Sequence, residues 1–146
     1  MENYDALKLE NQLCFPLYAA SREVIKRYAP FLGELDLTYT QYIVMMVLWQ
    51  EKEISVKELG GRLFLDSGTL TPVLKSLDEK GFVSRRRSAE DERVVLVAAT
   101  KAGAELRERA ASVPGRVSGC VRLEPRDAAK LYELLYKLLG AMDDGR

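Results

Sequence analysis

The sequence predicts a mainly α-helical protein with a small β-hairpin. Apolar residues recur at helical intervals through most of the chain, and two β-rich stretches, residues 82–87 and 93–98, flank a short polar segment. The chain of 146 residues fits one domain of ordinary size. It contains no internal repeat and no low-complexity tract, so we expect a single domain over residues 1–146.

Two helices are expected in the N-terminal third of the chain. The first, over residues 5–28, has an apolar stripe at helical spacing. Pro16 lies inside that stretch, where a proline removes a backbone hydrogen bond, so we expect a kink near residues 12–16. The segment from Pro30 to Gly33 is expected to break the chain. A second, strongly apolar helix is expected from Thr40 to Gln50.

The next two helices are separated by a short turn. Ser55 and Glu58 form a capping box, in which the hydroxyl and the carboxylate each accept a hydrogen bond from a backbone amide at the start of a helix. The helix that they open is short, residues 56–63. A longer helix is expected to begin near Ser67 and to end at Gly81, which has the position of a C′ glycine.

Two further helices are expected after the hairpin. Thr100 can cap the first, which runs to about residue 112, where the Pro-Gly pair at 114–115 interrupts it. The last helix, residues 125–142, begins with a proline in its first turn, where proline is tolerated, and residues 143–146 should fray. Its apolar stripe consists of Leu131, Leu134, Leu135, Leu138 and Leu139.

The composition excludes several classes of protein. Two cysteines do not make a disulfide scaffold in a chain of this size, and they are too few for a cysteine-only zinc site. The chain has no histidine, which removes the Ser-His and Cys-His nucleophile pairs of many enzymes. We therefore expect no enzymatic activity, no metal and no cofactor.

The sequence indicates neither a membrane protein nor a secreted one. The longest apolar run, residues 43–48, is far short of the ~20 residues that span a bilayer, and the acidic N-terminus lacks the apolar core of a secretion signal. We expect a cytoplasmic protein without a membrane partner. The net charge is zero, which argues weakly against nucleic-acid binding, so the placement of the charges matters more than their sum.

A short helix, a tight turn, a longer helix and a hairpin make a winged helix-turn-helix. The second helix of such a unit can insert into a major groove of DNA. Short hydroxyl side chains at its start suit contacts with phosphates and base edges, and Gly68 lets the backbone approach closely. Its buried stripe consists of Leu70, Leu74 and Leu77. Ser76 is expected on the exposed face. The candidate DNA contacts on this helix are Ser67, Gly68, Thr69, Thr71, Pro72 and Lys75.

The hairpin has arginines on its strands and acidic residues at its tip. Residues 82–93 hold four positive and three negative charges, so basicity alone does not decide for DNA. An Asp91–Arg93 pair can fix the direction of the arginine for insertion into a minor groove. The candidate DNA contacts of the hairpin are Arg85, Arg86, Asp91 and Arg93. Arginines on a strand pair are also typical of a solvated face, and from the pattern alone both interpretations stay open.

Four segments match a known pattern. Residues 65–72, Leu-Asp-Ser-Gly-Thr-Leu-Thr-Pro, resemble the recognition helix of the MarR family, and most closely that of its organic-hydroperoxide-sensing branch, OhrR. Residues 87–93 resemble the wing of that family, including its Asp-x-Arg signature. The match extends to residues 9–15 and 37–42, and it is weakest after Pro114. The resemblance covers nearly the whole chain.

The resemblance implies a domain plan and a function. It implies a winged helix-turn-helix over residues 36–100, with dimerisation helices in residues 1–35 and 101–146. It also implies a transcriptional repressor that binds a pseudo-palindromic, double-stranded DNA operator as a homodimer, with organic hydroperoxides as inducers.

Cys14 is the candidate redox sensor. From the residues alone, a lone cysteine on an apolar helix stripe is more often an inert small hydrophobe. No histidine is present to stabilise its thiolate, and helix N-terminal amides are expected to lie too far away because Cys14 is placed well inside its helix. Hydroxyl donors remain, and Tyr18 is one turn further along the same face. The resemblance implies that Cys14 reacts with peroxide and that Tyr28 and Tyr39 of the other subunit bond to it.

Cys120 is the candidate second redox residue. In two-cysteine members of the family, a cysteine of the other subunit condenses with the oxidised sensor to a disulfide, and Cys120 lies at the matching place. In one-cysteine members a small external thiol takes that role. The resemblance therefore implies that Cys120 is the resolving cysteine, and an unreactive free thiol is the alternative. Pro16 departs from the expected family pattern beside Cys14.

Three other functions stay open at this stage. The first is a MarR-type repressor that a small aromatic ligand releases from DNA, without redox chemistry. The second is a thiol peroxidase, which the absence of histidine disfavours. The third is an adaptor that uses the same fold without binding DNA.

Overall fold

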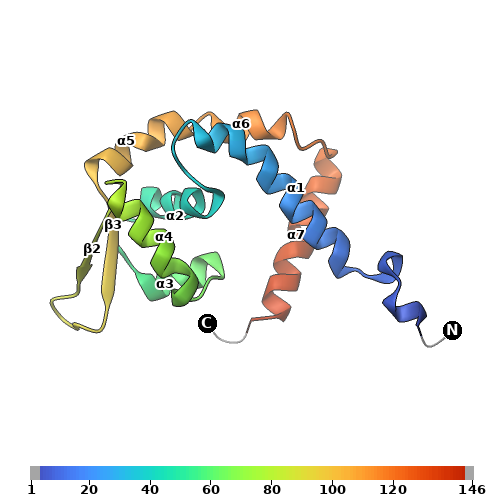
Figure 1. Cartoon of the computed structure of the whole chain (residues 1–146), viewed down its shortest axis with the longest axis horizontal. Helices are drawn as coiled ribbons and strands as arrows, with labels where there is room; N and C mark the ends of the chain where they lie inside the picture. Colours follow the sequence, from blue (N-terminus) through green and yellow to red (C-terminus); the bar gives the residue numbers. More distant parts are fainter. Residues whose placement is uncertain (1–3, 144–146) are drawn as a thin grey trace.

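The computed structural model describes residues 4–143, and the expected fraying of 144–146 lies outside the described residues. The predicted fold class is confirmed, since the chain is mostly helical with one small antiparallel sheet (Figure 1). No helix in the described part is long and apolar enough to cross a membrane. The α-helices are α1 (Cys14–Gly33), α2 (Tyr39–Gln50), α3 (Val56–Leu63), α4 (Ser67–Glu79), α5 (Lys101–Ala110), α6 (Val113–Ser118) and α7 (Pro125–Ala141).

The first helix differs from the prediction at both ends. It begins at Cys14, and the residues before it form two short 3-10 turns, η1 (Asp5–Leu7) and η2 (Leu9–Asn11). Pro16 therefore lies in the first turn of α1, where its missing amide has no intrahelical partner to lose, and the predicted kink inside a helix is wrong. The helix also continues through Pro30 to Gly33, because Leu32 packs into the core with 1% of its surface exposed.

The helix-turn-helix follows the predicted boundaries closely. The Ser55 hydroxyl accepts a hydrogen bond from the Glu58 amide at the start of α3. The turn into α4 is tight because Gly60 has no side chain: a Cβ there would lie 2.5 Å from the carbonyl oxygen of Leu65. Gly81, with φ of +81°, ends α4 as the predicted C′ residue. Leucines of α3 and α4 form the centre of the core: Leu59, Leu70, Leu74 and Leu77.

The hairpin belongs to a three-stranded sheet of strand order β1-β3-β2. The strands are β1 (Ile54–Ser55), β2 (Val83–Arg87) and β3 (Val95–Ala99). Strand β1 was not predicted, because two residues have no periodicity of their own and become a strand only by pairing with β3. Strand β3 begins two residues later than predicted, since the amide of Val94 bonds to the Asp91 carbonyl within the turn.

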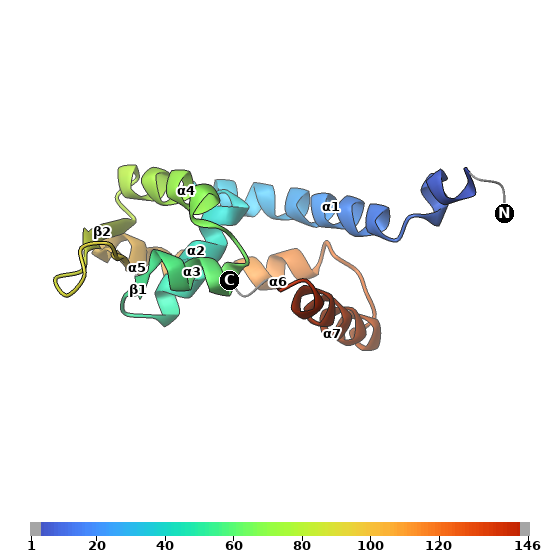
Figure 2. The ribbon, with the colours of Figure 1, turned by 90° about the horizontal axis from the view of Figure 1, so that it is seen from below.

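The C-terminal helices extend away from the sheet (Figures 1 and 2). Thr100 caps α5 as predicted, by accepting a hydrogen bond from the Gly103 amide. The predicted interruption at 114–115 is wrong, because Pro114 stands in the first turn of α6, where proline is tolerated. The last helix begins at Pro125 as expected. None of the predicted leucines of its stripe is fully buried within the chain: Leu131, Leu134 and Leu138 are exposed, and Leu135 and Leu139 are half-buried.

Candidate DNA-binding surface and redox site

The recognition helix α4 exposes the predicted candidate contacts. Its leucine stripe is buried, and Asp66 caps the helix by accepting a hydrogen bond from the Thr69 amide at 2.7 Å. The Thr71 hydroxyl donates to the carbonyl of Ser67 at 2.7 Å. The six candidate residues are all exposed: Ser67, Gly68, Thr69, Thr71, Pro72 and Lys75. Ser76 is half-buried and bonds to Gln41 of α2, so its predicted place on the exposed face is wrong.

The predicted Asp91–Arg93 pair is present at the tip of the wing. The Nε and Nη2 atoms of Arg93 donate to the two carboxylate oxygens of Asp91, each at 3.1 Å, and the Arg93 amide donates to Oδ1 at 3.0 Å. These side-chain and backbone hydrogen bonds hold the pKa of Asp91 below its usual value of 3.8. The Arg93 side chain is 91% exposed, so one oriented guanidinium projects from the wing into solvent.

The strand arginines are paired within the protein. Arg85 bonds to Asp78 of α4 at 3.1 Å, and Arg86 forms a two-pronged pair with Glu53 at 2.8 and 3.1 Å. Their contact with DNA stays a prediction. Within the chain, these bonds attach the wing to the recognition helix and to the segment before β1.

Cys14 is the first residue of α1, and its side chain is exposed. The expectation that helix amides lie far from it is wrong. The amides of the first helical turn have no intrahelical acceptors, and the positive end of the helix dipole lies there. Tyr18 follows one turn later, and its hydroxyl accepts a hydrogen bond from Arg22 at 3.4 Å. Tyr18 is thus polarised by a neighbouring cation on the same exposed face.

Tyr28 and Tyr39 lie together, at the other end of α1 from Cys14. Their ring centroids are 5.0 Å apart, and Tyr42 lies within 5.9 Å of the first and 6.3 Å of the second. Burial, reinforced by Tyr28, raises the pKa of Tyr39 and of Tyr42 above the usual 10.0, so both phenols keep their protons at neutral pH. Tyr28 follows Cys14 by fourteen residues, or about 21 Å along a helix that rises 1.5 Å per residue. The structure therefore brings the tyrosines together but not to the Cys14 of their own chain.

Cys120 lies in the turn after α6. Its thiol is exposed, and Sγ lies 3.8 Å from the carbonyl oxygen of Arg116. Both cysteines are free thiols. Arg116 pairs with Glu34 through two bonds of 2.8 and 3.1 Å and lies over the ring of Phe31, so α6 is held against the C-terminal end of α1.

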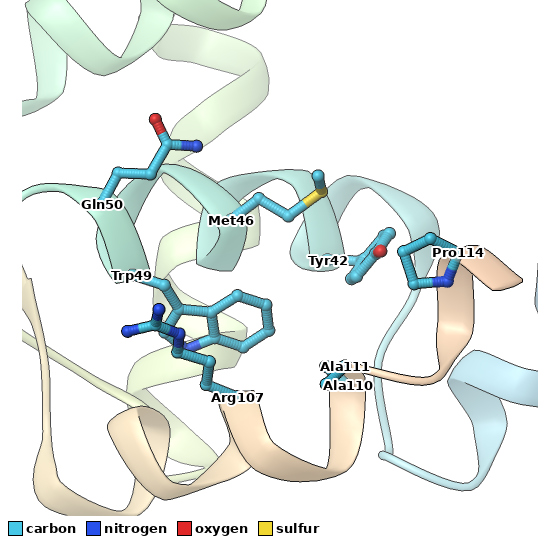
Figure 3. Close-up of a pocket in the computed structure, with 8 residues that line it drawn as sticks. All are labelled: Tyr42, Met46, Trp49, Gln50, Arg107, Ala110, Ala111 and Pro114. Atoms are coloured by element: carbon cyan, nitrogen blue, oxygen red, sulfur yellow. The ribbon is translucent and has the colours of Figure 1, made fainter.

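A small cavity, open to solvent, is lined by residues of α2, α5 and α6 and the turn between α5 and α6 (Figure 3). Its volume is about 280 Å³, and its walls are mostly apolar. The indole of Trp49 forms one wall and donates to the carbonyl of Gly103 at 2.9 Å. Tyr42 belongs both to this cavity and to the tyrosine cluster. The lining residues are Tyr42, Met46, Trp49, Gln50, Arg107, Ala110, Ala111 and Pro114. Among residues 4–143, no group of three potential metal ligands gathers here or elsewhere.

Comparison with known proteins places the chain among gene regulators. Residues 26–109 match the family described as transcriptional regulator SarA/Rot. Over 140 residues the chain is 49% identical to the organic hydroperoxide resistance transcriptional regulator of Bacillus subtilis (strain 168), and the match covers 95% of each protein. The chain belongs to this family of transcriptional regulators. The predicted resemblance to the hydroperoxide-sensing branch of the MarR regulators is confirmed, and so is the expectation of a regulator rather than an enzyme.

Solved structures of AbfR from Staphylococcus epidermidis resemble this regulator, and they include reduced, overoxidized and disulfide forms. Reduced AbfR bound to DNA is 32% identical with a TM-score of 0.77, and the match covers 95% of this chain and 96% of that one. Disulfide-formed AbfR is 34% identical with a TM-score of 0.65, covering 92% and 95%. Overoxidized AbfR bound to DNA has the same TM-score of 0.77 as the reduced form. The regulator is therefore closer in shape to DNA-bound AbfR than to the disulfide form.

Sequence reasoning missed Gln41 of α2. Its buried side chain caps α2 together with Thr38 and also bonds to α4. The Thr-x-x-Gln pattern at 38–41 is a capping box that the sequence shows. Its bonds to Ser76 and Lys80 span more than thirty residues, and no local pattern predicts them.

Proposed function

We propose that this chain is a homodimeric repressor that leaves its operator when an organic hydroperoxide oxidises Cys14. The supporting observation is the separation of about 21 Å along α1 between Cys14 and Tyr28. The half-buried phenol of Tyr39 keeps its proton, but the tyrosine cluster can donate to a Cys14 thiolate only if that thiolate belongs to a second chain. The close relationship to an organic hydroperoxide resistance regulator supports the choice of inducer.

A second copy of the chain has apolar surface to cover. Three leucines of the α7 stripe are exposed, and so are the large apolar side chains beside Cys14 at the start of α1. Exposed apolar patches of this extent mark protein interfaces, and a symmetric dimer buries the same patch on both subunits. In the proposed plan, residues 36–100 form the winged helix, and residues 1–35 and 101–146 form the dimer.

The dimer presents two recognition helices to DNA. Each α4 enters a major groove with its hydroxyl-rich first turn, and the two half-sites lie one helical turn of DNA apart, which requires a pseudo-palindromic operator. Each wing places Arg93 in the adjacent minor groove. A DNA operator as partner also means that the regulator acts in the cytoplasm.

The redox step is a two-electron oxidation of sulfur. The Cys14 thiolate attacks the terminal oxygen of the hydroperoxide, so that an S–O bond forms and the O–O bond breaks; the alkoxide leaves and takes up a proton to become an alcohol. The thiolate of Cys120 from the other subunit then attacks the sulfenic sulfur. A disulfide forms, and hydroxide leaves and is protonated to water.

A second candidate is release by a small aromatic ligand. The cavity of about 280 Å³ beside Trp49 and Arg107 favours it, because an aromatic ring with an anionic substituent suits an apolar pocket with one cation. The reduced protein would then leave DNA when it binds an aromatic acid such as salicylate, with both cysteines still thiols.

Operator binding by wild type and Cys14→Ser separates the two candidates. We expect both proteins to bind the DNA upstream of the regulator's own gene with similar affinity in fluorescence anisotropy. One equivalent of cumene hydroperoxide should release the wild type and leave Cys14→Ser bound. A serine variant that still leaves DNA with peroxide would contradict the redox function, and release of reduced wild type by salicylate would support the second candidate.

A further inference from the structure

A single buried amide connects the start of α2 to the recognition helix. Only 5% of the surface of Gln41 is exposed. Its Oε1 accepts from the Thr38 amide at 3.0 Å and from the Lys80 ammonium at 2.9 Å, and its Nε2 donates to the Ser76 hydroxyl at 3.0 Å. Because two donors point at the same atom, that atom must be the amide oxygen. One side chain therefore caps α2 and holds α4 and its C-terminal cap at two points.

Lys80 extends this connection to the junction between α1 and α2. Its ammonium also donates to the carbonyl of Asp36 at 2.6 Å. Asp36 has a positive φ of 57°, in the left-handed region that few residues other than glycine adopt. The hydrogen bond from Lys80 thus stabilises an uncommon backbone conformation at the point where the chain passes from α1 into α2. The C-terminal end of α4 is fastened to that same point.

The Gln41 connection and the tyrosine cluster share the first turn of α2. Tyr39 and Tyr42 flank Gln41 in sequence, and both pack against Tyr28 of α1. A displacement of Tyr39 therefore moves the helix start that Gln41 caps. Leaving a buried amide without its partners is unfavourable, so α4 follows this turn instead of separating from it.

We propose that Gln41 is a positioning residue that transmits the redox state of the sensor to the recognition helix. This inference rests on the proposed function. Oxidation of Cys14 changes what the other subunit's Tyr28 and Tyr39 contact, and the first turn of α2 shifts with them. The amide of Gln41 moves α4 through Ser76 and Lys80, which changes the fit of α4 to its major groove. Coupling between the sensor and the DNA-binding surface requires a structural element that contacts both sites and has two arrangements. The first turn of α2, joined to α4 by Gln41, is that element.

The test is the ratio of operator dissociation constants in the oxidised and reduced states. Gln41→Leu removes the amide and keeps a similar volume. We expect its ratio to fall by on the order of tenfold relative to wild type, while Cys14 still oxidises, as mass spectrometry measures. Gln41→Glu retains two acceptor oxygens for Thr38 and Lys80, and Ser76 can donate to it, so this variant should restore the ratio.

Arg62→Met is the control. It removes a side-chain connection from α3 to Glu51 and Gln50 at the end of α2 and leaves the bonds of Gln41 to α4 in place. Its ratio should equal that of wild type. If Gln41→Leu does not fold, Lys80→Met removes the same connection from the side of α4 and should lower the ratio in the same direction.

Three outcomes are distinguishable. If Gln41→Leu binds DNA more weakly by the same factor in both redox states, Gln41 only caps the helix, and the inference is overturned. The same holds if its affinity equals that of wild type in both states. In either case the ratio of the oxidised to the reduced dissociation constant is unchanged from wild type, and an unchanged ratio overturns the inference. If wild type itself shows no loss of operator affinity on oxidation, the proposed function fails before the role of Gln41 is tested.

Discussion

At the scale of single residues, Arg93 shows how an ion pair can direct a side chain. Asp91 holds the guanidinium from the same turn, and the exposed fraction of the arginine remains 91%. Surface ion pairs add little stability, so the value of this pair lies in orientation. The neighbouring Arg85 and Arg86 have partners on other elements. The sequence predicts all three arginines as contacts and predicts the pairing of Arg93 with Asp91, whereas the partners of Arg85 and Arg86 come from the structure alone.

Arg93→Ala should weaken operator binding by on the order of tenfold and reduce the magnitude of its salt slope by about one. The physical reason is the loss of one cation at the minor groove. The measurement is anisotropy across a series of potassium chloride concentrations. Arg126→Ala removes the same charge from α7, away from the wing, and should leave both quantities unchanged. Equal effects from the two variants would remove Arg93 from the DNA contacts.

The place of Cys14 in its helix could be predicted only in part. The apolar stripe continues across the 3-10 turns and α1, so periodicity alone joined them into one helix. Pro16 was the informative signal. Proline is favoured in the first turn of a helix, and that interpretation of Pro16 places the helix start at Cys14, where the structure has it.

At the scale of elements, two adjacent glycines in α3 differ in the space that a side chain would have. A Cβ on Gly60 would lie 2.5 Å from the carbonyl oxygen of Leu65, in the turn between α3 and α4. A Cβ on Gly61 would meet nothing within 4 Å. The turn of the helix-turn-helix therefore requires a glycine at the first position and not at the second.

Gly60→Ala should destabilise the protein by about 1–3 kcal/mol, because the turn must move to admit the methyl group. Gly61→Ala should stabilise it by about 0.5–1 kcal/mol, since alanine loses less backbone entropy in a helix. Guanidinium denaturation followed by circular dichroism measures both. Comparable stability for the two variants would contradict the tight turn.

Elements with both a start signal and a stop signal were predicted best. Helices α3 and α4 have a cap at one end and a turn or glycine at the other, and their bounds agree with the structure. The prediction is wrong where it interprets a proline as the end of a helix, since Pro30 and Pro114 lie inside helices. Strand β1 depends on a partner forty residues away, so its own two residues could not reveal it.

At the scale of the whole molecule, one chain places the residues of the proposed sensor, Cys14 and the tyrosine cluster, toward opposite ends of α1. Sequence resemblance named Cys14, Tyr28 and Tyr39 and implied that they meet across a dimer. The structure supplies a physical reason, because a continuous helix separates Cys14 from the tyrosine cluster of its own chain. What no sequence pattern could supply is the connection onward to α4 through Gln41, which depends on tertiary contacts.

The most direct measurement uses a mixed dimer of Cys14→Ser and Cys120→Ser subunits, made distinguishable by mass. Only one pair of reactive thiols remains in it, Cys14 on one subunit and Cys120 on the other. After one equivalent of cumene hydroperoxide, non-reducing electrophoresis should show a covalent heterodimer, and each single-variant homodimer should stay uncrosslinked. An uncrosslinked mixed dimer, beside a wild type whose disulfide forms within single chains, would contradict a sensor shared between subunits.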